Sequence, residues 1–328
     1  KHFNPIKQYD GTAEMEKDNV VLIILESFSP EYIGSMNGEG TTSTPFFDSL
    51  VTESLLCTQC FANGKKSVDA MPSLISSIPK LMEKEYMNSS FSANTIESIP
   101  KVLATMGYSS SFYHGASNGS MTFDVYCDLA RFDNYYGRDE YNNEDHFDGT
   151  WGIFDHHFLP FCIEKMNEKE TPFFSTIFTI SSHDPYAIPE EFKDRFKNGP
   201  SPKNDAIEYM DFALSEFFRM AQQQPWFDNT LFIITADHTP ASGNLAYFSE
   251  IGKMRVPLLF YHPTNDLFQG KKEHIVSQID VMPTIFDVVG YDQAFFAFGE
   301  SIFKPHQGYS ASKIGESFLI FNDEDTAQ

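Results

Sequence analysis

The sequence has no long apolar run. No stretch approaches the roughly 18 consecutive apolar residues that a membrane-spanning helix needs, and the first residues hold neither an initiator Met nor the apolar core of a signal peptide. No repeat, low-complexity tract or clear linker divides the 328 residues. With 41% hydrophobic and 15% aromatic residues, the chain can bury a large core. These features predict one domain over residues 19–328, preceded by a polar lead-in over residues 1–18.

Basic residues are scarce. The chain has 23 Lys and Arg against 46 Asp and Glu, a formal net charge of −23 at pH 7. Nucleic-acid binding depends on clustered Lys and Arg that release counterions, so this balance argues against a nucleic acid as partner. It also argues against attachment to an anionic membrane through a basic patch. A phosphate-bearing substrate would need a local positive charge at its site, and a bound cation is the expected source.

Cysteine is rare as well, with four in the chain. Cys57 and Cys60 form a C-x-x-C pair, but no second pair or nearby histidine completes a structural zinc site. Ordinary buried thiols are the first expectation, and a local disulfide or metal and redox chemistry are the alternatives. The cysteines therefore do not identify the compartment.

Short apolar runs are abundant, and several end abruptly in polar or charged residues. Uninterrupted runs of this length are typical of strands buried on both faces of a parallel sheet. Helical patterns alternate with them, which predicts an α/β doubly wound sandwich: a mostly parallel central sheet with helices on both faces and a small C-terminal subregion. The expected strands are 20–25, 111–113, 173–180, 231–235 and 256–261, and the expected helices are 95–106, 204–224 and 281–289.

The residues that end these runs are candidates for a site. In open α/β sheets, ligands bind outside the carboxyl ends of the strands, so polar residues at several strand ends can converge although they are far apart in sequence. The residues expected to converge are Glu26, His114, His183, Asp237 and His238.

Three of these residues have the chemistry of a metal site. Two carboxylates and an imidazole, Glu26 with Asp237 and His238, suit Zn, Mn or Mg. Ser67 follows a glycine-containing turn and precedes a helical pattern, so it is expected near a helix N-terminus that favours a phosphoryl group. A metal in such a site lowers the pKa of a nucleophile in its fourth position, and Ser67 is the candidate.

An ordered set of motifs then carries a family resemblance. The set resembles that of the sulfatase-like phosphoglycerol transferases, a family of the alkaline phosphatase superfamily that includes lipoteichoic acid synthases. The resemblance runs from residue 19 to about residue 290. Its segments are Val20–Phe28, Gly64–Ser67 with Leu74 and Ser77–Pro79 downstream, Asp148–Asp155, Ser181–Tyr186, Thr235–His238 and Gln278–Ile285.

The resemblance implies a catalytic centre. Glu26, Ser67, Asp237 and His238 match the family's ligands of one divalent ion, with Mn the first expectation and Zn or Mg the alternatives. Ser67 stands where the family usually has a threonine nucleophile. His183 matches the histidine that contacts the substrate and protonates the leaving group. Ser67 and His183 are therefore the implied catalytic residues.

The resemblance also implies a substrate region. Lys66 stands where many relatives have Arg, and with His114, His183 and Trp151 it is expected to contact substrate. Structural roles are the alternative for His114 and Trp151. The pair His156-His157 is expected to be ordinary surface or core, and Asp280 a helix cap.

As a whole, the family implies transfer of a phosphoglycerol-type group from a phospholipid donor, through a covalent Ser67 intermediate, to a glycan or polymer hydroxyl. It implies that residues 1–18 lead in from a membrane anchor and that residues 19–328 form a single sulfatase-like catalytic domain in the periplasm or outside the cell. It does not fix the oligomeric state.

Other activities of the superfamily stay open as alternatives. After His114 the loop continues through Asp124 and Tyr126, where lipoteichoic acid synthases carry Trp and Arg, so the donor headgroup is not fixed and a phosphoethanolamine transferase is an alternative. A phosphodiesterase or sulfatase-type hydrolase is another, although Ser67-Val-Asp-Ala-Met lacks the Pro and Arg of a sulfatase motif. A catalytically dead binding domain is disfavoured because all four expected metal ligands are present.

Overall fold

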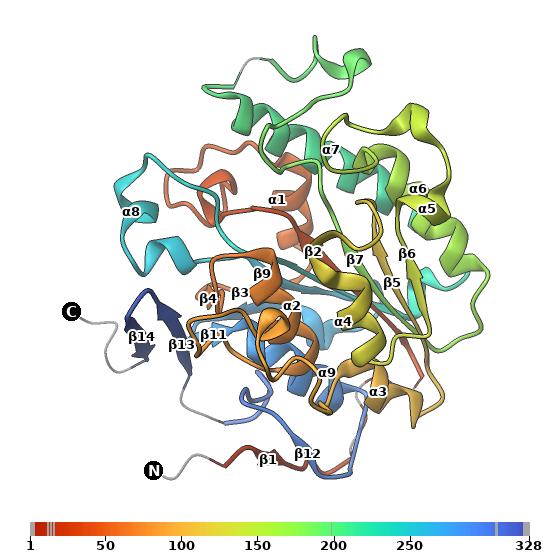
Figure 1. The fold of residues 1–328 in the computed structure, drawn as a ribbon, viewed down its shortest axis with the longest axis vertical. Coiled ribbons are helices and arrows are strands. Elements are labelled where there is room, and N and C mark those ends of the chain that lie inside the picture. Colours follow the sequence, from red (N-terminus) through yellow and green to blue (C-terminus); the bar gives the residue numbers. More distant parts are fainter. Residues whose placement is uncertain are drawn as a thin grey trace.

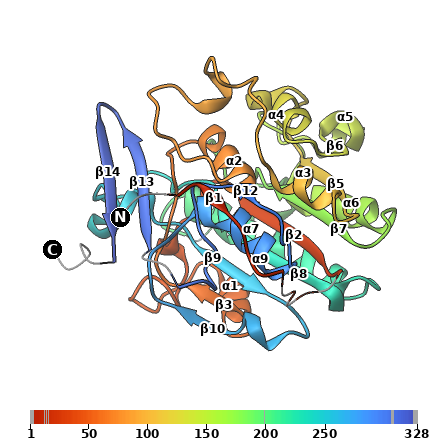
Figure 2. The same ribbon diagram turned by 90° about the horizontal axis from the view of Figure 1, so that it is seen from below.

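The computed structural model describes residues 4–11, 13, 15, 17–197, 199–305 and 308–323. Its centre is an eight-stranded sheet with the order β10-β3-β9-β8-β2-β7-β5-β6. β9 runs antiparallel to both of its neighbours, and the other pairs in this sheet are parallel. Helices pack on the two faces of the sheet (Figures 1 and 2). The expected doubly wound, mostly parallel α/β architecture is confirmed.

The elements have the following bounds. The central strands are β2 (Asn19–Leu25), β3 (Leu55–Cys57), β5 (Ser109–His114), β6 (Asn134–Tyr136), β7 (Phe173–Phe178), β8 (Thr230–Ala236), β9 (Leu258–Tyr261) and β10 (Gly270–Lys272). One helical layer contains α1 (Pro45–Val51), α6 (Asp155–Asn167) and α7 (Pro202–Ala221), and the other contains α2 (Ser67–Ser76), α3 (Ile99–Ala104) and α9 (Val281–Val288). Shorter helices are α4 (Phe123–Leu129), α5 (Arg138–Tyr141) and α8 (Leu245–Phe248). Three small sheets pair β1 (Ile6–Lys7) with β12 (Phe295–Phe296), β4 (Cys60–Phe61) with β11 (Val276–Ser277), and β13 (Tyr309–Ile314) with β14 (Ser317–Asn322).

β2 is the central strand that positions the site. Every residue from Asn19 to Leu25 is buried, because the strand lies between β7 and β8 and under both helical layers. Burial of its apolar side chains stabilises this position, since removing apolar surface from water is the main driving force of folding. The chain emerges from β2 at Glu26, which is buried too.

One expected strand runs against the rest of the sheet, and one helix begins later than expected. The 256–261 run does form a strand, but β9 is antiparallel to its neighbours. His262, which follows β9, therefore lies at the end of the sheet opposite to Glu26. Its Nε2 is 3.2 Å from Oδ2 of Asp18, the residue before β2. The helix expected to begin at residue 95 begins at Ile99, because the Ser98 side chain accepts a hydrogen bond from the backbone N–H of Lys101 and caps it there.

Both ends of the described chain contact the domain at small β elements. β1 pairs antiparallel with β12, and the ammonium of Lys7 is 2.7 Å from a carboxylate oxygen of Glu300. The hairpin β13–β14 forms the C-terminal subregion. Of the helices described, none combines the length and the apolar character needed to cross a bilayer.

All four cysteines are buried free thiols, in agreement with the first expectation. Burial raises the pKa of the Cys57 and Cys60 thiols, which keeps them protonated and unreactive.

The packing of β2 predicts a large effect of truncating Ile23, a fully buried side chain. We expect Ile23→Ala to lower the free energy of unfolding by about 2–5 kcal/mol and Ile23→Val by about 0.5–1.5 kcal/mol, because a buried cavity adds to the lost transfer energy. Urea unfolding measures both. The matched control is Ile320→Ala, at a side chain that is 64% exposed, which should change stability by less than about 0.5 kcal/mol. Equal losses at the two positions would contradict the packing.

Candidate active site

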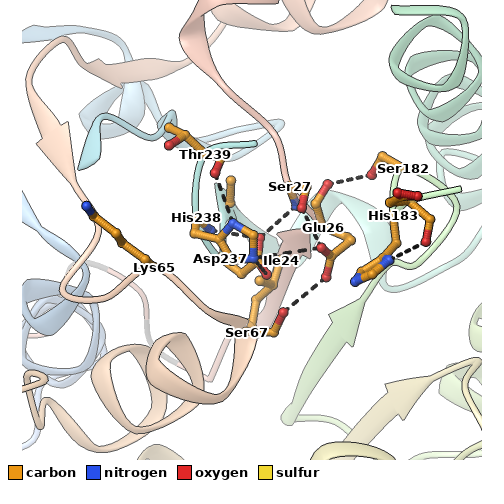
Figure 3. A network of polar contacts seen from close by, with 12 residues as sticks. Ile24, Glu26, Ser27, Lys65, Ser67, Ser182, His183, Asp237, His238 and Thr239 are labelled. Atoms are coloured by element: carbon orange, nitrogen blue, oxygen red, sulfur yellow. Dashed lines mark hydrogen bonds and ion pairs between the residues drawn. The ribbon is translucent and has the colours of Figure 1, made fainter. Parts of the chain in front are cut away.

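The ends of β2 and β8 bring two carboxylates together. The strands are neighbours with Leu25 opposite Ala236, so Glu26 and Asp237 emerge side by side, each only 1% exposed. Asp237 Oδ1 accepts hydrogen bonds from the backbone N–H groups of Ser27 and His238, both at 2.7 Å. Asp237 Oδ2 is buried without a hydrogen-bond partner among the described residues. Figure 3 shows these side chains converging at the strand ends.

His238 completes this group. Its Nε2 is 3.2 Å from Asp237 Oδ2 and 3.9 Å from Glu26 Oε1. Its Nδ1 is 3.1 Å from the Thr239 carbonyl, which can only accept, so that contact holds the proton on Nδ1 and leaves the Nε2 lone pair for the carboxylate side. One ligand atom from each of the three residues lies within 4.8 Å of the others.

Ser67 brings a hydroxyl to the same place. It is the first residue of α2, is nearly buried, and its Oγ donates to Glu26 Oε2 at 3.3 Å. The turn before the helix needs Gly64, because a Cβ there would lie 2.2 Å from Asp69 Cβ. The free N–H groups of the first turn of α2 therefore begin beside the carboxylates, in a position suited to an anion.

The charges of the group fit a divalent cation. Burial, and next the charge of Asp237, raise the pKa of Glu26 well above its usual range; hydrogen bonds from Ser27 and Ser67 act in the opposite direction. No Lys or Arg of the described chain pairs with either carboxylate. The group offers a divalent cation two carboxylates, an imidazole nitrogen and a hydroxyl oxygen, and one of its buried oxygens has no partner among the described residues. Such ligands suit Mn, Zn or Mg. A bound cation would remove the repulsion.

His183 and Trp151 lie next to each other, on the segment that follows β7 and the loop before α6. Their ring centroids are 4.3 Å apart, and both His183 Nδ1 and Trp151 Nε1 lie 2.7 Å from the Asp184 carbonyl. In the view of Figure 3, His183 and His238 lie on opposite sides of the Glu26–Asp237 pair. The Asp184 carbonyl can only accept, so His183 Nδ1 carries a proton and Nε2 is the atom left for a substrate.

His114 lies deeper than expected, within β5 rather than beyond it. It is fully buried, its Nδ1 contacts the Phe178 carbonyl at 3.1 Å, and its Nε2 has no hydrogen-bond partner in the described chain. Burial lowers its pKa to about 4, and it is close enough to Asp237 and His183 for their charges to act on it. A neutral imidazole with one unpartnered nitrogen is suited to a hydrogen bond with a ligand.

Lys66 is oriented differently from the other predicted substrate contacts. Its ammonium is 2.6 Å from Glu85 Oε1, and its side chain is 63% exposed. Although Lys66 is adjacent to Ser67, it pairs with Glu85, just before the short helix Tyr86–Asn88, and not with the carboxylate group, because Ser67 starts α2 and Lys66 is still extended. Its role as a substrate contact stays a prediction.

Three further residues hold the site together, and sequence reasoning gave none of them a role. Ser27 adopts a left-handed conformation (φ 49°), which turns its N–H toward Asp237, and its hydroxyl donates to Glu26 at 2.6 Å. The Gln278 amide donates to the carbonyls of Ala236 and Asp237, both at 2.8 Å, and its oxygen accepts from the Asn63 N–H at 3.0 Å. Gln278 thus connects the end of β8 to the turn that carries Ser67.

The third is Asp155, at the start of α6. Its carboxylate accepts from the backbone N–H groups of Ile180 at 3.0 Å and Ser181 at 2.7 Å, and so fixes the chain that leads into His183. Burial raises its pKa to about 6. Both Gln278 and Asp155 lie in the motifs noted above, which was the available signal, but nothing in their spacing shows which distant backbone they hold.

Solved structures with the same fold identify its class. A protein in the alkaline phosphatase superfamily from Vibrio parahaemolyticus superposes with a TM-score of 0.85 at 25% identity, covering 96% of this chain and 77% of that one. The lipoteichoic acid synthase LtaP from Listeria monocytogenes superposes with a TM-score of 0.81 at 20% identity, covering 93% and 80%, a likeness of fold. The fold is that of the alkaline phosphatase superfamily.

Sequence comparison narrows the class. A sequence model of the sulfatase family matches residues 18–291, most of the chain. The chain therefore belongs to the sulfatase family. Lipoteichoic acid synthase 1 from Bacillus subtilis (strain 168) is 27% identical to it over 342 residues, which cover 95% of this chain and 52% of that protein. The chain spans about half the length of the curated relatives it matches.

The repulsion between Glu26 and Asp237 predicts a pH effect in protein stripped of metal. Because the pKa of Glu26 is raised in the folded state, the folded protein keeps a proton that the unfolded chain releases, so stability falls as the pH rises above the ordinary carboxyl range. Glu26→Gln should reduce this fall and raise the melting temperature of the EDTA-treated protein at pH 8. Thermal unfolding across pH measures it, with exposed Glu83→Gln as the control. A lower melting temperature for Glu26→Gln than for wild type at pH 8 would count against the buried pair.

The role of Gln278 predicts a combined loss of stability and metal affinity. Gln278→Ala leaves two carbonyls and the Asn63 N–H unpaired in a buried region. We expect this loss of hydrogen-bond partners to lower the free energy of unfolding by about 1–3 kcal/mol. Divalent-metal affinity, measured by calorimetry, should fall with it because Asp237 loses its support. Exposed Gln293→Ala should change neither quantity. Unchanged metal affinity in Gln278→Ala would show that Asp237 is held by other contacts.

Proposed function

We propose that this domain transfers a phosphoglycerol-type group from a phospholipid to a hydroxyl of a glycan or polymer, through a covalent intermediate on Ser67. The single observation that carries the proposal is the Ser67 hydroxyl, at the N-terminus of α2 and 3.3 Å from Glu26, in a group that also holds Asp237 and His238. The likeness to lipoteichoic acid synthase 1 over 95% of the chain supports a phosphoglycerol-type donor.

Each residue has a definite part in this reaction. Ser67 Oγ, as the alkoxide, attacks the donor phosphorus while the bond to the diacylglycerol oxygen breaks, and the N–H groups of α2 face the phosphoryl oxygens. His183, which carries a proton on both ring nitrogens at the start of this step, gives its Nε2 proton to the departing oxygen. In the second half, an acceptor hydroxyl gives its proton to His183 Nε2 and attacks phosphorus, which releases Ser67. When bound by Glu26, Ser67, Asp237 and His238, a divalent ion, with Mn the first choice, lowers the pKa of Ser67 and offsets phosphoryl charge.

The donor headgroup is the part of the proposal with an alternative. Tyr126 stands where lipoteichoic acid synthases carry Arg, and it is buried with its hydroxyl 2.7 Å from Ser76 Oγ. The position therefore supplies no cation to a headgroup phosphate. This observation favours a second candidate, a phosphoethanolamine transferase or a phosphodiesterase that uses the same nucleophile.

The whole-protein setting is proposed on the same grounds. We place residues 19–328 as a catalytic domain in the periplasm or outside the cell, joined through residues 1–18 to a membrane anchor on the N-terminal side. This placement puts the domain beside the lipid donor that the reaction uses.

One set of variants tests the reaction. We expect near-stoichiometric Mn, Zn or Mg in wild type and Ser67→Ala and a loss of metal in Glu26→Ala, because Glu26 supplies a buried carboxylate to the ion. Release of diacylglycerol from fluorescent phosphatidylglycerol should fall by about 10³-fold or more in both variants. Elemental analysis and chromatography of the lipid products measure the two effects.

Ser67→Thr is the matched control, because it keeps the hydroxyl and should keep measurable turnover. Turnover of phosphatidylethanolamine or of bis(p-nitrophenyl) phosphate, without turnover of phosphatidylglycerol, would replace the donor and retain the nucleophile. Full activity in Ser67→Ala, or no metal in wild type after incubation with each ion, would overturn the mechanism.

A further inference from the structure

A second group of metal-binding side chains lies outside the active site. It consists of His156 and His157, in the first turn of α6, and Glu191, in the short helix Glu190–Phe192. One ligand atom from each lies within 4.8 Å of the others. Among the described residues, this group and the active-site group are the two sets of three that come so close.

His156 is held in an orientation that suits a metal ligand. Its Nδ1 is 2.6 Å from the Tyr209 hydroxyl, which also receives the backbone N–H of His156, and its side chain is 12% exposed. The Tyr209 oxygen can accept from Nδ1–H, and that tautomer leaves the Nε2 lone pair facing Glu191 Oε1 at 3.5 Å. A second partner on the far ring nitrogen is typical of histidines that bind metals.

A simple ion pair does not account for the contact with Glu191. The rings of His156 and His157 have centroids 3.8 Å apart, and His146 stacks on His157 at 3.5 Å. Burial, and next the neighbouring imidazoles, lower the pKa of His157 to about 4, and burial also lowers that of His156, against the opposing charge of Glu191. Both shifts favour the neutral imidazole, which is the form that binds a metal.

We propose that His156, His157 and Glu191 bind a divalent transition-metal ion, with Zn²⁺ the best match. Two imidazoles and one carboxylate form a known zinc ligand set, in which water takes the fourth position. Glu191 is part of the segment between β7 and α7 that also carries His183, whereas both histidines are on α6. The ion would therefore connect α6 to the segment that carries His183, and restrict its motion near the substrate.

The experiment uses Zn²⁺ as the probe and a Glu26→Ala background, in which the active-site group has lost a carboxylate. We expect this protein to bind one Zn²⁺ at the second group, as measured by titration calorimetry. Adding Glu191→Gln should weaken binding by at least about tenfold, since losing even an outer partner of a metal ligand costs about 10–100-fold. Glu191 is exposed, so this variant should fold normally, and circular dichroism checks it.

Glu190→Gln is the matched control, because Glu190 is the adjacent carboxylate and forms a surface ion pair with Lys193. It should leave Zn²⁺ affinity unchanged, whereas His157→Asn should lower it as Glu191→Gln does. Hydrogen exchange of residues 184–197 should slow on adding Zn²⁺ to the parent and not to Glu191→Gln. Equal Zn²⁺ affinity in the Glu26→Ala protein with and without Glu191→Gln or His157→Asn would overturn the proposal. So would the absence of Zn²⁺ binding by the Glu26→Ala protein. Without the Glu26→Ala change, wild type should bind two ions and Glu191→Gln should bind one. This comparison does not depend on the role of Ser67.

Discussion

Glu26 and Asp237 are buried next to each other at the ends of two paired strands, and ionised groups in such a place repel each other strongly unless a cation lies between them. This constraint explains the surroundings of the pair. Ser27 turns its backbone N–H and hydroxyl toward the two carboxylates, His238 donates its backbone N–H to Asp237, and Ser67 donates from the first turn of α2. Each of these groups lowers part of the electrostatic cost, and none supplies the missing positive charge.

The site is kept rigid from outside by two polar side chains with long-range partners. Gln278 holds the β8 end and the Asn63 turn at fixed separation, and Asp155 holds the chain after β7. Both are buried and bind backbone groups, so their loss leaves unpaired polar atoms that water cannot reach. Residues that never contact substrate thus set the distances between Ser67, Asp237 and His183.

The sequence could predict the sheet and the carboxylate pair because parallel strands place their ends at one edge, whatever lies between them. It could not predict the direction of β9, because a buried apolar run has the same pattern in a parallel and in an antiparallel strand. For the same reason, the sequence did not show that His262 lies far from Glu26. The roles of Ser27 and Gln278 were equally hidden, because they depend on backbone groups that the fold brings near. Lys66 shows the same limit: its neighbour Ser67 faces the carboxylates, but Glu85 determines where its own ammonium points.

The position of β2 in the sheet has a consequence for biosynthesis. Residues 19–25 leave the ribosome before their partners, which are residues 173–178 and 230–236. At about 5–20 residues per second, the wait for roughly 200 further residues is on the order of 10–40 s. Until then β2, in which residues 20–25 are all apolar, lacks at least one of its two neighbours, and such segments are prone to pair with other chains. The element at the centre of the finished domain is thus incompletely paired until much of the chain has been made, and production of the domain should depend on how quickly the chain is completed and on chaperones that hold it unfolded until then.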